Sequence, residues 1–548
     1  MLEHLDLNAI QDANARELVI RLLNLIEKLS ADLRDAQADI QRLRDENNRL
    51  KGEQGKPKIN PNVANPPADH SSEKERHKPH QRSKGSKNAN IQIDREQVVK
   101  VDQANLPADA EFKGYEDVVV QDILLRTDNV RFRKEKYYAV STRKTYLAEL
   151  PRGYAGQFGP GIKTLTLAMY FGMGSSEPKI LEFFTNVGIQ ISDGELSNLL
   201  IKEQDPFHAE KDTVYEAGLR SSPWQHTDDT QTRVNGQNQH CHVVCNPLYT
   251  AYHTRPTKER LTVLDVLRNG RERVFRLNQE ALGYLENVQL SKAAWQTLLN
   301  WSSEQDRDEA SFLAQLDTHL PNLGAQQRKA IIDAAAIAAY HAETEFPVVR
   351  VLLCDDAPQF NWLTYEMMLC WVHEGRPYKK LLPVMPLHRE RLDDFLKRFW
   401  EYYDQLLIYR QAPTPEESLR LETEFDNLFA TRTQYEELDK RIAKTQAKKA
   451  SLLLVLKYPE LPLHNNPAEL AVRQRVRKRD VSFGPRTLEG VRAWDTFMTL
   501  AATAKKLGVS FYQYIHDRIC QTNQIPLLAS LVEKAAKELN LGRSWSSA

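Results

Sequence analysis

The chain has 548 residues, several times the usual domain length of about 100 to 200 residues, so two to four folded units are expected. Lys plus Arg and Asp plus Glu both total 74, so the net charge neither favours nor excludes a nucleic-acid partner. The five cysteines are scattered, which argues against a secreted disulfide framework. No apolar run approaches the roughly 18 residues of a membrane span, and the first residues lack a signal-peptide layout. We therefore expect a cytoplasmic protein with no membrane partner.

Residues 1–50 are predicted to form a coiled-coil dimerisation helix. Apolar side chains recur there in alternating steps of three and four residues, and the seam comprises Leu22, Ile26, Leu29, Leu33, Ala36, Ile40, Leu43, Asn47 and Leu50. β-branched side chains at position a of the heptad, with a polar Asn47 at the same position, favour a parallel dimer in one register. We expect a homodimer through residues 19–50. The alternative is one long helix packed on its own chain, which would usually carry a broader apolar stripe.

The next two segments differ sharply in composition. Residues 51–90 are rich in Pro, Lys, Asn and Ser and poor in large apolar side chains, so they predict a disordered basic linker. A solvated tether is favoured there over weak phosphate contact. A small β unit is predicted over residues 91–152, where the runs VVVQDILL, VRFRKEKYYAV and KTYLAEL are typical of short strands.

A helical region is predicted over residues 153–218. The stretch EPKILEFFTNVG, then IQI, then SDGELSNLLIKE indicates helix, turn and helix, with Ser192 and Glu195 forming a capping box. A DNA-binding helix-turn-helix and a purely structural helical hairpin are equally compatible with it. The second helix carries only Lys202 as a basic residue, with no row of Arg or Gln for base edges.

Residues 219–500 show the order of an α/β, ribonuclease-H-like catalytic core. WQHTDDTQTRV, QHCHVVC and LYTAYHTR predict three antiparallel strands joined by tight turns at Asn235-Gly236 and Asn246-Pro247. A helix, the buried strand PVVRVLLC and a last helix bearing an acid follow. Large α-helical insertions are expected at about 273–344 and 381–456, and a C-terminal helical tail at 501–548.

Three acids on separate predicted elements are candidate metal ligands: Asp228, Asp355 and Glu469. Cutting a phosphodiester requires an activated attacking oxygen and a stabilised leaving oxyanion, and two Mg²⁺ ions about 3.5 to 4 Å apart serve both needs. Hard cations prefer carboxylate oxygens. Acids that converge from two adjacent strands and a helix would hold such ions rigidly.

Two of the acids stand in Asp-Asp pairs, and each has a structural alternative. Successive strand side chains point to opposite faces, so Asp228 or Asp229, and Asp355 or Asp356, faces the metals. We prefer the first of each pair and leave the second open. Glu469 also fits a capping-box-like helix start, with Asn466 as N-cap and the acid at the third helical position.

Several motifs resemble those of one family. They are His226-Thr227-Asp228-Asp229-Thr230, then Cys370-Trp371-Val372-His373, then Asn465-Asn466-Pro467-Ala468-Glu469 with Arg473 and Ser482-Phe483-Gly484. In this order they resemble the IS66 (TnpC-like) family of bacterial insertion-sequence transposases, DDE enzymes. The N-terminal zipper, the basic linker and the helical tail resemble that family as well.

The resemblance implies a DNA transposase that cuts element ends and joins the 3′-hydroxyl to target DNA. It implies an acidic triad of Asp228, Asp355 and Glu469, two Mg²⁺ ions for which Mn²⁺ can substitute, and a bacterial, nucleoid-associated protein whose partner is DNA. Basic residues near the acids are candidate phosphate contacts, with a solvated basic helix as the alternative: Arg473, Arg475, Arg477, Lys478, Arg479, His373 and Arg376.

Two departures mark a divergent member of such a family. Residues 91–150 contain no cysteine where the family usually carries a zinc module, and Asp229 stands where the family generally shows Glu. Cys370 and His373 lack a second ligand pair, so no zinc is expected. The competing interpretations are a ribonuclease-H-like nuclease without strand transfer and an inactive transposase descendant that only binds DNA.

Overall fold

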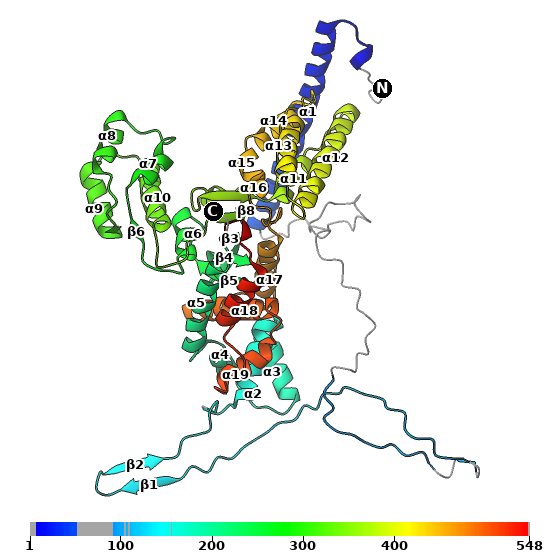
Figure 1. Cartoon of the computed structure of the whole chain (residues 1–548), viewed down its shortest axis with the longest axis vertical. Coiled ribbons are helices and arrows are strands. Elements are labelled where there is room, and N and C mark those ends of the chain that lie inside the picture. The colour runs from blue at the N-terminus through cyan, green and yellow to red at the C-terminus, as the bar shows by residue number, and fades with distance from the viewer. Residues whose placement is uncertain (1–6, 52–90, 103–105, 108–109, 155, 546–548) are drawn as a thin grey trace.

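The computed structural model describes residues 7–51, 91–102, 106–107, 110–154 and 156–545. A mixed five-stranded sheet lies at the centre, with helices packed around it (Figure 1). Its strands are β3 (Trp224–Val234), β4 (Gln237–Asn246), β5 (Tyr249–Arg255), β8 (Val351–Cys354) and β9 (Glu366–Leu369). Their spatial order is β5-β4-β3-β8-β9. The linker predicted for 51–90 lies outside the described residues except for Lys51.

The first three strands form the predicted antiparallel meander. Asn235 and Gly236 have φ angles of 47° and 77°, as the two central positions of a type I′ hairpin turn require. β8 pairs in parallel with β3, and β9 pairs in parallel with β8. β8 is buried throughout, which explains its continuous apolar sequence. Strand β9 was not predicted, because its four residues carry no alternating pattern.

The free edge of β5 is covered by helix α18 (Leu488–Lys506). The backbone N–H groups of Thr254, Tyr252 and Thr250 donate to the side chains of Asp495, Thr499 and Thr503. These acceptors recur every four residues and so lie on one face of the helix. The edge therefore has no open row of donors with which another strand could pair.

The two faces of the sheet pack against different helices. Helices α5 (Asp205–Arg220), α6 (Arg260–Leu267) and α10 (Ala325–His341) share a core with Val244 and Leu352. Val243 and Cys245, on the opposite face of β4, pack against α17 (Asn466–Ser482) and α18. The sheet is thus covered on both sides, as its mostly apolar strands require.

Helical insertions follow β5 and β9, close to the predicted ranges. The first contains β6 (Val274–Phe275), α7 (Gln279–Leu285), α8 (Lys292–Trp301), β7 (Arg307–Asp308), α9 (Glu309–His319) and α10. After η6 (Pro358–Phe360), β9 and α11 (Trp371–Lys379), the second contains α12 (Pro386–Tyr409), α13 (Pro415–Phe429), α14 (Glu436–Gln446), α15 (Lys449–Leu452) and α16 (Leu454–Lys457). The second insertion has its own aromatic core, centred on the fully buried Trp371 and Phe399.

Helix α1 (Ala13–Leu50), preceded by η1 (Leu7–Ala9), lies against the second insertion (Figure 1). Its buried Glu27 accepts hydrogen bonds from the N–H groups of Val384 and Met385 at the start of α12. Asn24 accepts from the N–H of Glu436 at the start of α14. One face of the helix is therefore packed on its own chain, as the alternative interpretation held.

The small β unit predicted for 91–152 is only a hairpin, β1 (Lys136–Ala139) with β2 (Lys144–Leu147). The run VVVQDILL forms no strand, and the side chains of Val120 and Leu124 in it are 79% and 83% exposed. The prediction of three strands was wrong, because the described residues of this unit contain neither a third strand nor a core against which such apolar side chains can pack.

The helical region and the C-terminal region pack together. They comprise α2 (Pro160–Leu167), the π-helix η5 (Ala168–Gly172), α3 (Glu177–Asn186), α4 (Asp193–Ile201), α18, α19 (Phe511–Ile519), α20 (Leu528–Leu539) and η7 (Arg543–Trp545). The capping box of Ser192 and Glu195 is confirmed at the start of α4. The predicted boundary at residue 500 falls inside α18, which runs on without a break. Among the described helices, none has the length and apolar character that crossing a bilayer requires.

Candidate functional site

Asp228 and Asp355 lie side by side at the middle of the sheet. Asp228 is in β3, and Asp355 directly follows β8. The strands pair in parallel with His226 opposite Leu353, and the same register continued by two residues places Asp228 opposite Asp355. Residues opposite each other on strands about 5 Å apart point to the same face. The two carboxylates are therefore neighbours on one face.

This face is the one that α17 covers. Val243 lies opposite Asp228 in β4 and packs with Ala468 and Ala471 of α17. Glu469 stands between those two alanines in the helix, half-buried. The fold thus brings the three predicted acids, from β3, the end of β8 and the first turns of α17, to one region of the sheet.

The structural explanation for Glu469 as a capping residue does not hold. Helix α17 begins at Asn466, with Asn465 as N-cap, so Glu469 is the fourth helical residue and not the third. The N-cap side chain makes no capping hydrogen bond. The Glu469 carboxylate instead reaches towards α11.

Asn465 ties together the segments that carry the acids. Its side-chain amide donates to the Thr227 carbonyl oxygen at 2.7 Å, and its amide oxygen lies 2.9 Å from Nδ1 of His226. Its backbone N–H donates to Sγ of Cys370 at 3.3 Å. Burial lowers the pKa of His226 to about 3, so the ring is neutral and its Nδ1–H donates to Asn465. This buried residue fixes the start of α17 against β3.

The acids are in an environment that disfavours their ionisation. Burial raises the pKa of Asp228 to about 7, and the carboxylates of Asp355, Asp229 and Glu469 act in the same direction. Burial also raises the pKa of Asp355, opposed by His373 and by the Ala357 N–H. Carboxylates gathered in this way favour a nearby cation, because its charge offsets their repulsion.

Glu469 is paired with two residues of α11. The Nη2 of Arg376 donates to Oε2 of Glu469 at 3.1 Å, and Nδ1 of His373 lies 3.5 Å from Oε1. The Nη1 of Arg376 also donates to Nε2 of His373 at 2.6 Å. Burial lowers the pKa of His373, and Arg376 adds to this effect, so the ring can accept that hydrogen bond. The two predicted phosphate contacts His373 and Arg376 thus stand directly beside a predicted catalytic acid.

A second combination of ligand atoms is found here. Cys370, His373 and Glu469 place one ligand atom each within 4.8 Å of the others, the only such trio in the described part of the chain. The three acids do not meet that spacing together, and the Glu469 carboxylate is hydrogen-bonded to Arg376. Acids that hold two ions about 4 Å apart can lie further from one another than acids that share one ion. Burial raises the pKa of the Cys370 thiol to about 11, so without a metal it is protonated.

Asp229 and Asp356 are engaged elsewhere. Oδ2 of Asp229 accepts from the side-chain amide of Gln359 at 3.0 Å, on the opposite face of β3. Oδ2 of Asp356 lies 2.7 Å from Nζ of Lys448. Each alternative acid therefore has its own polar partner, whereas Asp228 and Asp355 face each other and α17.

The five basic residues of α17 are not equivalent. Arg473 and Arg477 are exposed and follow Glu469 at intervals of four, which places them on its face of the helix. Arg479 is half-buried and donates to the Gln231 carbonyl oxygen in β3. Arg473 and Arg477 are thus available to a polyanion beside the acids.

Arg475 and Lys478 are buried, contrary to their prediction as phosphate contacts. Arg475 is 1% exposed and donates to Thr254 at 2.9 Å, with Asp495 at 3.4 Å. Lys478 is 4% exposed and donates to the Ser175 carbonyl oxygen at 2.9 Å. Both side chains point into the protein from the opposite face of α17, so we leave them out of the candidate interface.

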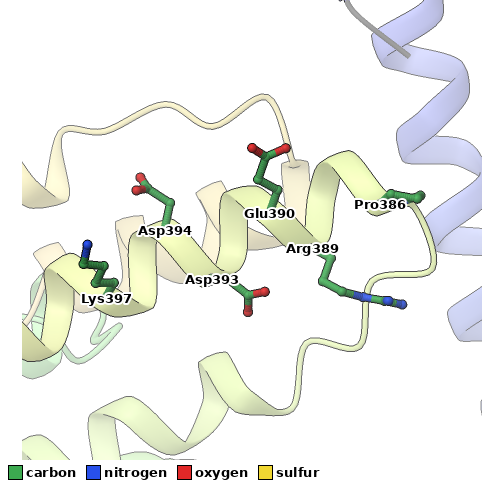
Figure 2. A pocket seen from close by; sticks show the side chains of 6 residues that line it. All are labelled: Pro386, Arg389, Glu390, Asp393, Asp394 and Lys397. Carbon is green, nitrogen blue, oxygen red and sulfur yellow. The ribbon is translucent and has the colours of Figure 1, made fainter. Parts of the chain in front are cut away.

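A hollow along α12 carries no second site. It is lined by Pro386, Arg389, Glu390, Asp393, Asp394 and Lys397. Figure 2 shows that these side chains leave the helix in different directions, with Glu390 and Asp394 on one side and Arg389 and Asp393 on the other. A binding site needs polar groups that converge on one point.

Sequence reasoning missed Asn465 and Gln359 as parts of the site. The only sequence signal for Asn465 was its place in the Asn-Asn-Pro motif four residues before Glu469. Its three partners come from two other segments, which no local pattern predicts. Gln359 had no sequence signal, because it acts through contact with a strand 130 residues away.

Comparison with known proteins gives two findings. Residues 334–493 match a family model described as the IS66 family of transposases; this range includes Asp355 and Glu469, and Asp228 lies upstream of it. The chain is also similar to the uncharacterized protein y4jO of Sinorhizobium fredii. The two are 32% identical over 321 residues, which is 58% of this chain and 99% of that protein.

Proposed function

The chain belongs to the IS66 family of transposases. On that premise we propose that it cuts DNA at the ends of an insertion sequence and joins the freed 3′-hydroxyl to target DNA. The site is the group around Asp228, Asp355 and Glu469. The sheet order, with three antiparallel strands followed by two parallel ones, supports a ribonuclease-H-like catalytic core.

One observation carries the proposal. The register of β3 and β8 sets Asp228 beside Asp355, on the face where α17 delivers Glu469. An acid on each of two adjacent strands and a third on a helix is the constellation that phosphoryl transfer by two metal ions needs. Asn465 supports it, because this buried side chain fixes the helix to the strand that carries Asp228.

The donor set fits magnesium. Carboxylate oxygens are the ligands that Mg²⁺ prefers, and the raised pKa of Asp228 marks a place where a cation would offset repulsion among the acids. When bound, two Mg²⁺ ions activate the attacking oxygen and stabilise the leaving oxygen. Asp228 and Asp355 would hold them, joined by Glu469 once its side chain turns from Arg376. Cys370 and His373 with Glu469 offer one ligand fewer than a structural zinc site has.

Exposed cations beside the acids would position the DNA. Arg473 and Arg477 lie along the face of α17 that begins with Glu469, where they can pair with successive phosphates. Arg376 is half exposed and can exchange the Glu469 carboxylate for a phosphate oxygen. These three arginines and His373 form the proposed grip on the scissile strand.

A second copy of the chain would pair through α1. The seam side chains are exposed even though the neighbouring face is packed on α12: Leu22 50%, Ile26 39%, Leu29 58%, Leu33 59%, Ile40 48%, Leu43 61% and Leu50 78%. A heptad seam left open beside a packed face fits a parallel dimer. Light scattering of the full chain measures this, and a monomeric mass at micromolar concentration would contradict it.

The decisive experiment is cleavage of labelled DNA that carries the inverted repeats flanking the gene, in Mg²⁺. Asp228→Asn, Asp355→Asn and Glu469→Gln each remove one negative charge with little change in shape. Cleavage should fall by orders of magnitude in each variant while DNA binding persists. Asp229→Asn and Asp356→Asn are the matched controls, because these neighbours point elsewhere, and they should retain cleavage.

Each contrary result has a definite meaning. Full cleavage by a triad variant would remove that residue from the site, and loss in a control would move the assignment to its neighbour. Cleavage without joining to target DNA would indicate a nuclease. Specific binding by the wild type with no cleavage in Mg²⁺ or Mn²⁺ would indicate an inactive descendant.

A further inference from the structure

Phe483 is an exposed aromatic residue whose position is explained neither by packing in the core nor by a preference for its backbone conformation. It ends α17 with its side chain 87% exposed, the highest value among the exposed large apolar side chains in the described part of the chain. Its backbone is left-handed, with φ 58° and ψ 7°. Gly or Asn usually occupies such a position, because a side chain with a Cβ atom is strained there.

The loop that carries Phe483 is held firmly against the β3–β4 hairpin. Gly484 approaches so closely that a Cβ atom there would lie 2.7 Å from the Arg233 carbonyl oxygen. The N–H of Asn235 donates to the Pro485 carbonyl oxygen at 3.3 Å, and Arg479 donates to the Gln231 carbonyl oxygen. The aromatic ring is therefore presented to solvent from a fixed position.

Three arginines lie in the segments beside Phe483, and Asp480 is an exposed acid on the last turn of α17. Arg477 precedes Phe483 on α17, Arg486 follows it, and Arg233 belongs to the hairpin that the loop touches; all three are exposed. An exposed aromatic ring among arginines is the composition of surfaces that stack on nucleic-acid bases while cations hold the backbone. A purely apolar protein interface would exclude such charges from its centre.

We propose that Phe483 inserts between bases of the bound DNA and unstacks one step of the duplex. This inference rests on the proposed function, because it takes DNA along α17 as given. Phe483 is a DNA-positioning residue and takes no part in the chemistry. It holds the duplex at a fixed distance from the acids while Arg473 and Arg477 contact the phosphates between.

The geometry sets where the insertion occurs. Phe483 lies fourteen positions after Glu469, and a helix rises about 1.5 Å per residue, so the residue lies roughly 21 Å along the axis from the acid. A duplex following the helix spans about 6 base pairs in that distance. The unstacked step should therefore lie about 6 base pairs from the phosphate that is cut.

The test uses 2-aminopurine, a base whose fluorescence rises when it is unstacked. It is placed singly at each position of the bound element end, including those 3 to 9 base pairs on either side of the cleaved phosphate, in the full-length Asp228→Asn protein so that the DNA stays intact. A several-fold rise is expected at one or two positions near 6. The rise should be lost in Phe483→Asn and Phe483→Gly and retained in Phe483→Trp, with binding about 5- to 150-fold weaker in the first two.

The controls separate stacking from other roles of the ring. Leu488→Asn removes another exposed apolar side chain, 77% exposed and five residues on, and should leave the fluorescence unchanged. Phe483→Asn should melt at the same temperature as the parent or higher, because Asn tolerates the left-handed backbone.

Three outcomes would overturn the proposal. They are no rise at any position, a rise retained in Phe483→Gly, and a lower oligomer mass in Phe483→Asn with the DNA signal intact, which would make the ring a protein contact. Fluorescence reports base stacking without cleavage, so failure of the insertion and failure of the proposed transposase activity are distinguishable.

Discussion

The basic residues of α17 occupy two faces of one helix with opposite environments. Arg473 and Arg477 are exposed and continue the face that begins with Glu469. Arg475 and Lys478, only one or two positions away, are buried against α18 and the helical region. Charge counted along the sequence is therefore not the charge available to a ligand. The phase of the helix decides which cations meet solvent and which stabilise the fold.

The buried face compensates its charges in two ways. The Arg475 guanidinium lies 4.6 Å from the Trp494 ring centre and 3.4 Å from Asp495, the acid that also accepts from the edge of β5. The Lys478 ammonium lies 3.2 Å from the centre of the Tyr170 ring. Stacking on aromatic faces makes burial of a cation tolerable, and Arg475 gains an ion pair as well.

The strongest test of this comparison is to remove the buried arginine. Arg475→Ala leaves the buried Asp495 without its charged partner and opens space beside Trp494, so unfolding should become easier by about 3–5 kcal/mol. Denaturant unfolding of the full chain measures the change. Arg473→Ala, two positions along on the exposed face, is the control and should change stability by less than about 0.5 kcal/mol. Equal losses in the two variants would contradict the distinction between the faces.

The same helix shows what the sequence could and could not predict. Local signals, which are alternation, turn residues and apolar runs, predicted three elements correctly. These are the meander, the buried strand before Asp355 and the helix that carries Glu469. The burial of Arg475 depends on Trp494 and Asp495 of another helix, and the Asn465 contacts depend on two further segments. Such contacts are long-range, and no periodicity within α17 predicts them.

In the N-terminal half, a local pattern predicted an element that the structure does not contain. Strand-like composition in VVVQDILL predicted a strand, but composition supplies only a propensity, and a strand also needs a partner and a core. For α1 the pattern predicted the helix and an apolar seam, yet gave no sign that Glu27, outside the seam, would be buried against α12. Local patterns thus predict elements better than they predict what each element contacts.

The buried Lys478 should have a smaller effect, which appears as a dependence of the protein's stability on pH. Burial lowers the pKa of Lys478 to about 7, against 10.5 for a free side chain, with Glu177 opposing the shift. The unfolded chain then binds more protons than the folded one between these values, so this residue makes stability rise as pH increases above about 7. Tyr170 is held protonated, its pKa raised to about 12, so it leaves the window from pH 7 to 9 undisturbed.

Lys478→Met should remove that dependence. The variant keeps a long side chain against Tyr170 without a buried charge. Between pH 7 and 9 the free energy of unfolding should therefore rise by about 2 kcal/mol less in the variant than in the wild type. Denaturant unfolding at several pH values, compared with the wild type, measures the difference. An unchanged slope would mean that Lys478 stays charged and that the Tyr170 ring, and not burial, controls its protonation.

Substitutions on the exposed face should have the smallest effect on stability and the clearest effect on DNA binding. Arg473→Gln and Arg477→Gln should each change the free energy of unfolding by less than about 0.5 kcal/mol, because neither side chain is buried. Each phosphate contact removed should lower the slope of log affinity against log salt by about 1, with little dependence on sequence. Lys444→Gln, an exposed cation at the end of α14, is the control for loss of charge alone. If Lys444→Gln lowers the slope as much as Arg477→Gln, the DNA responds to total charge and does not follow the face of α17 that begins with Glu469.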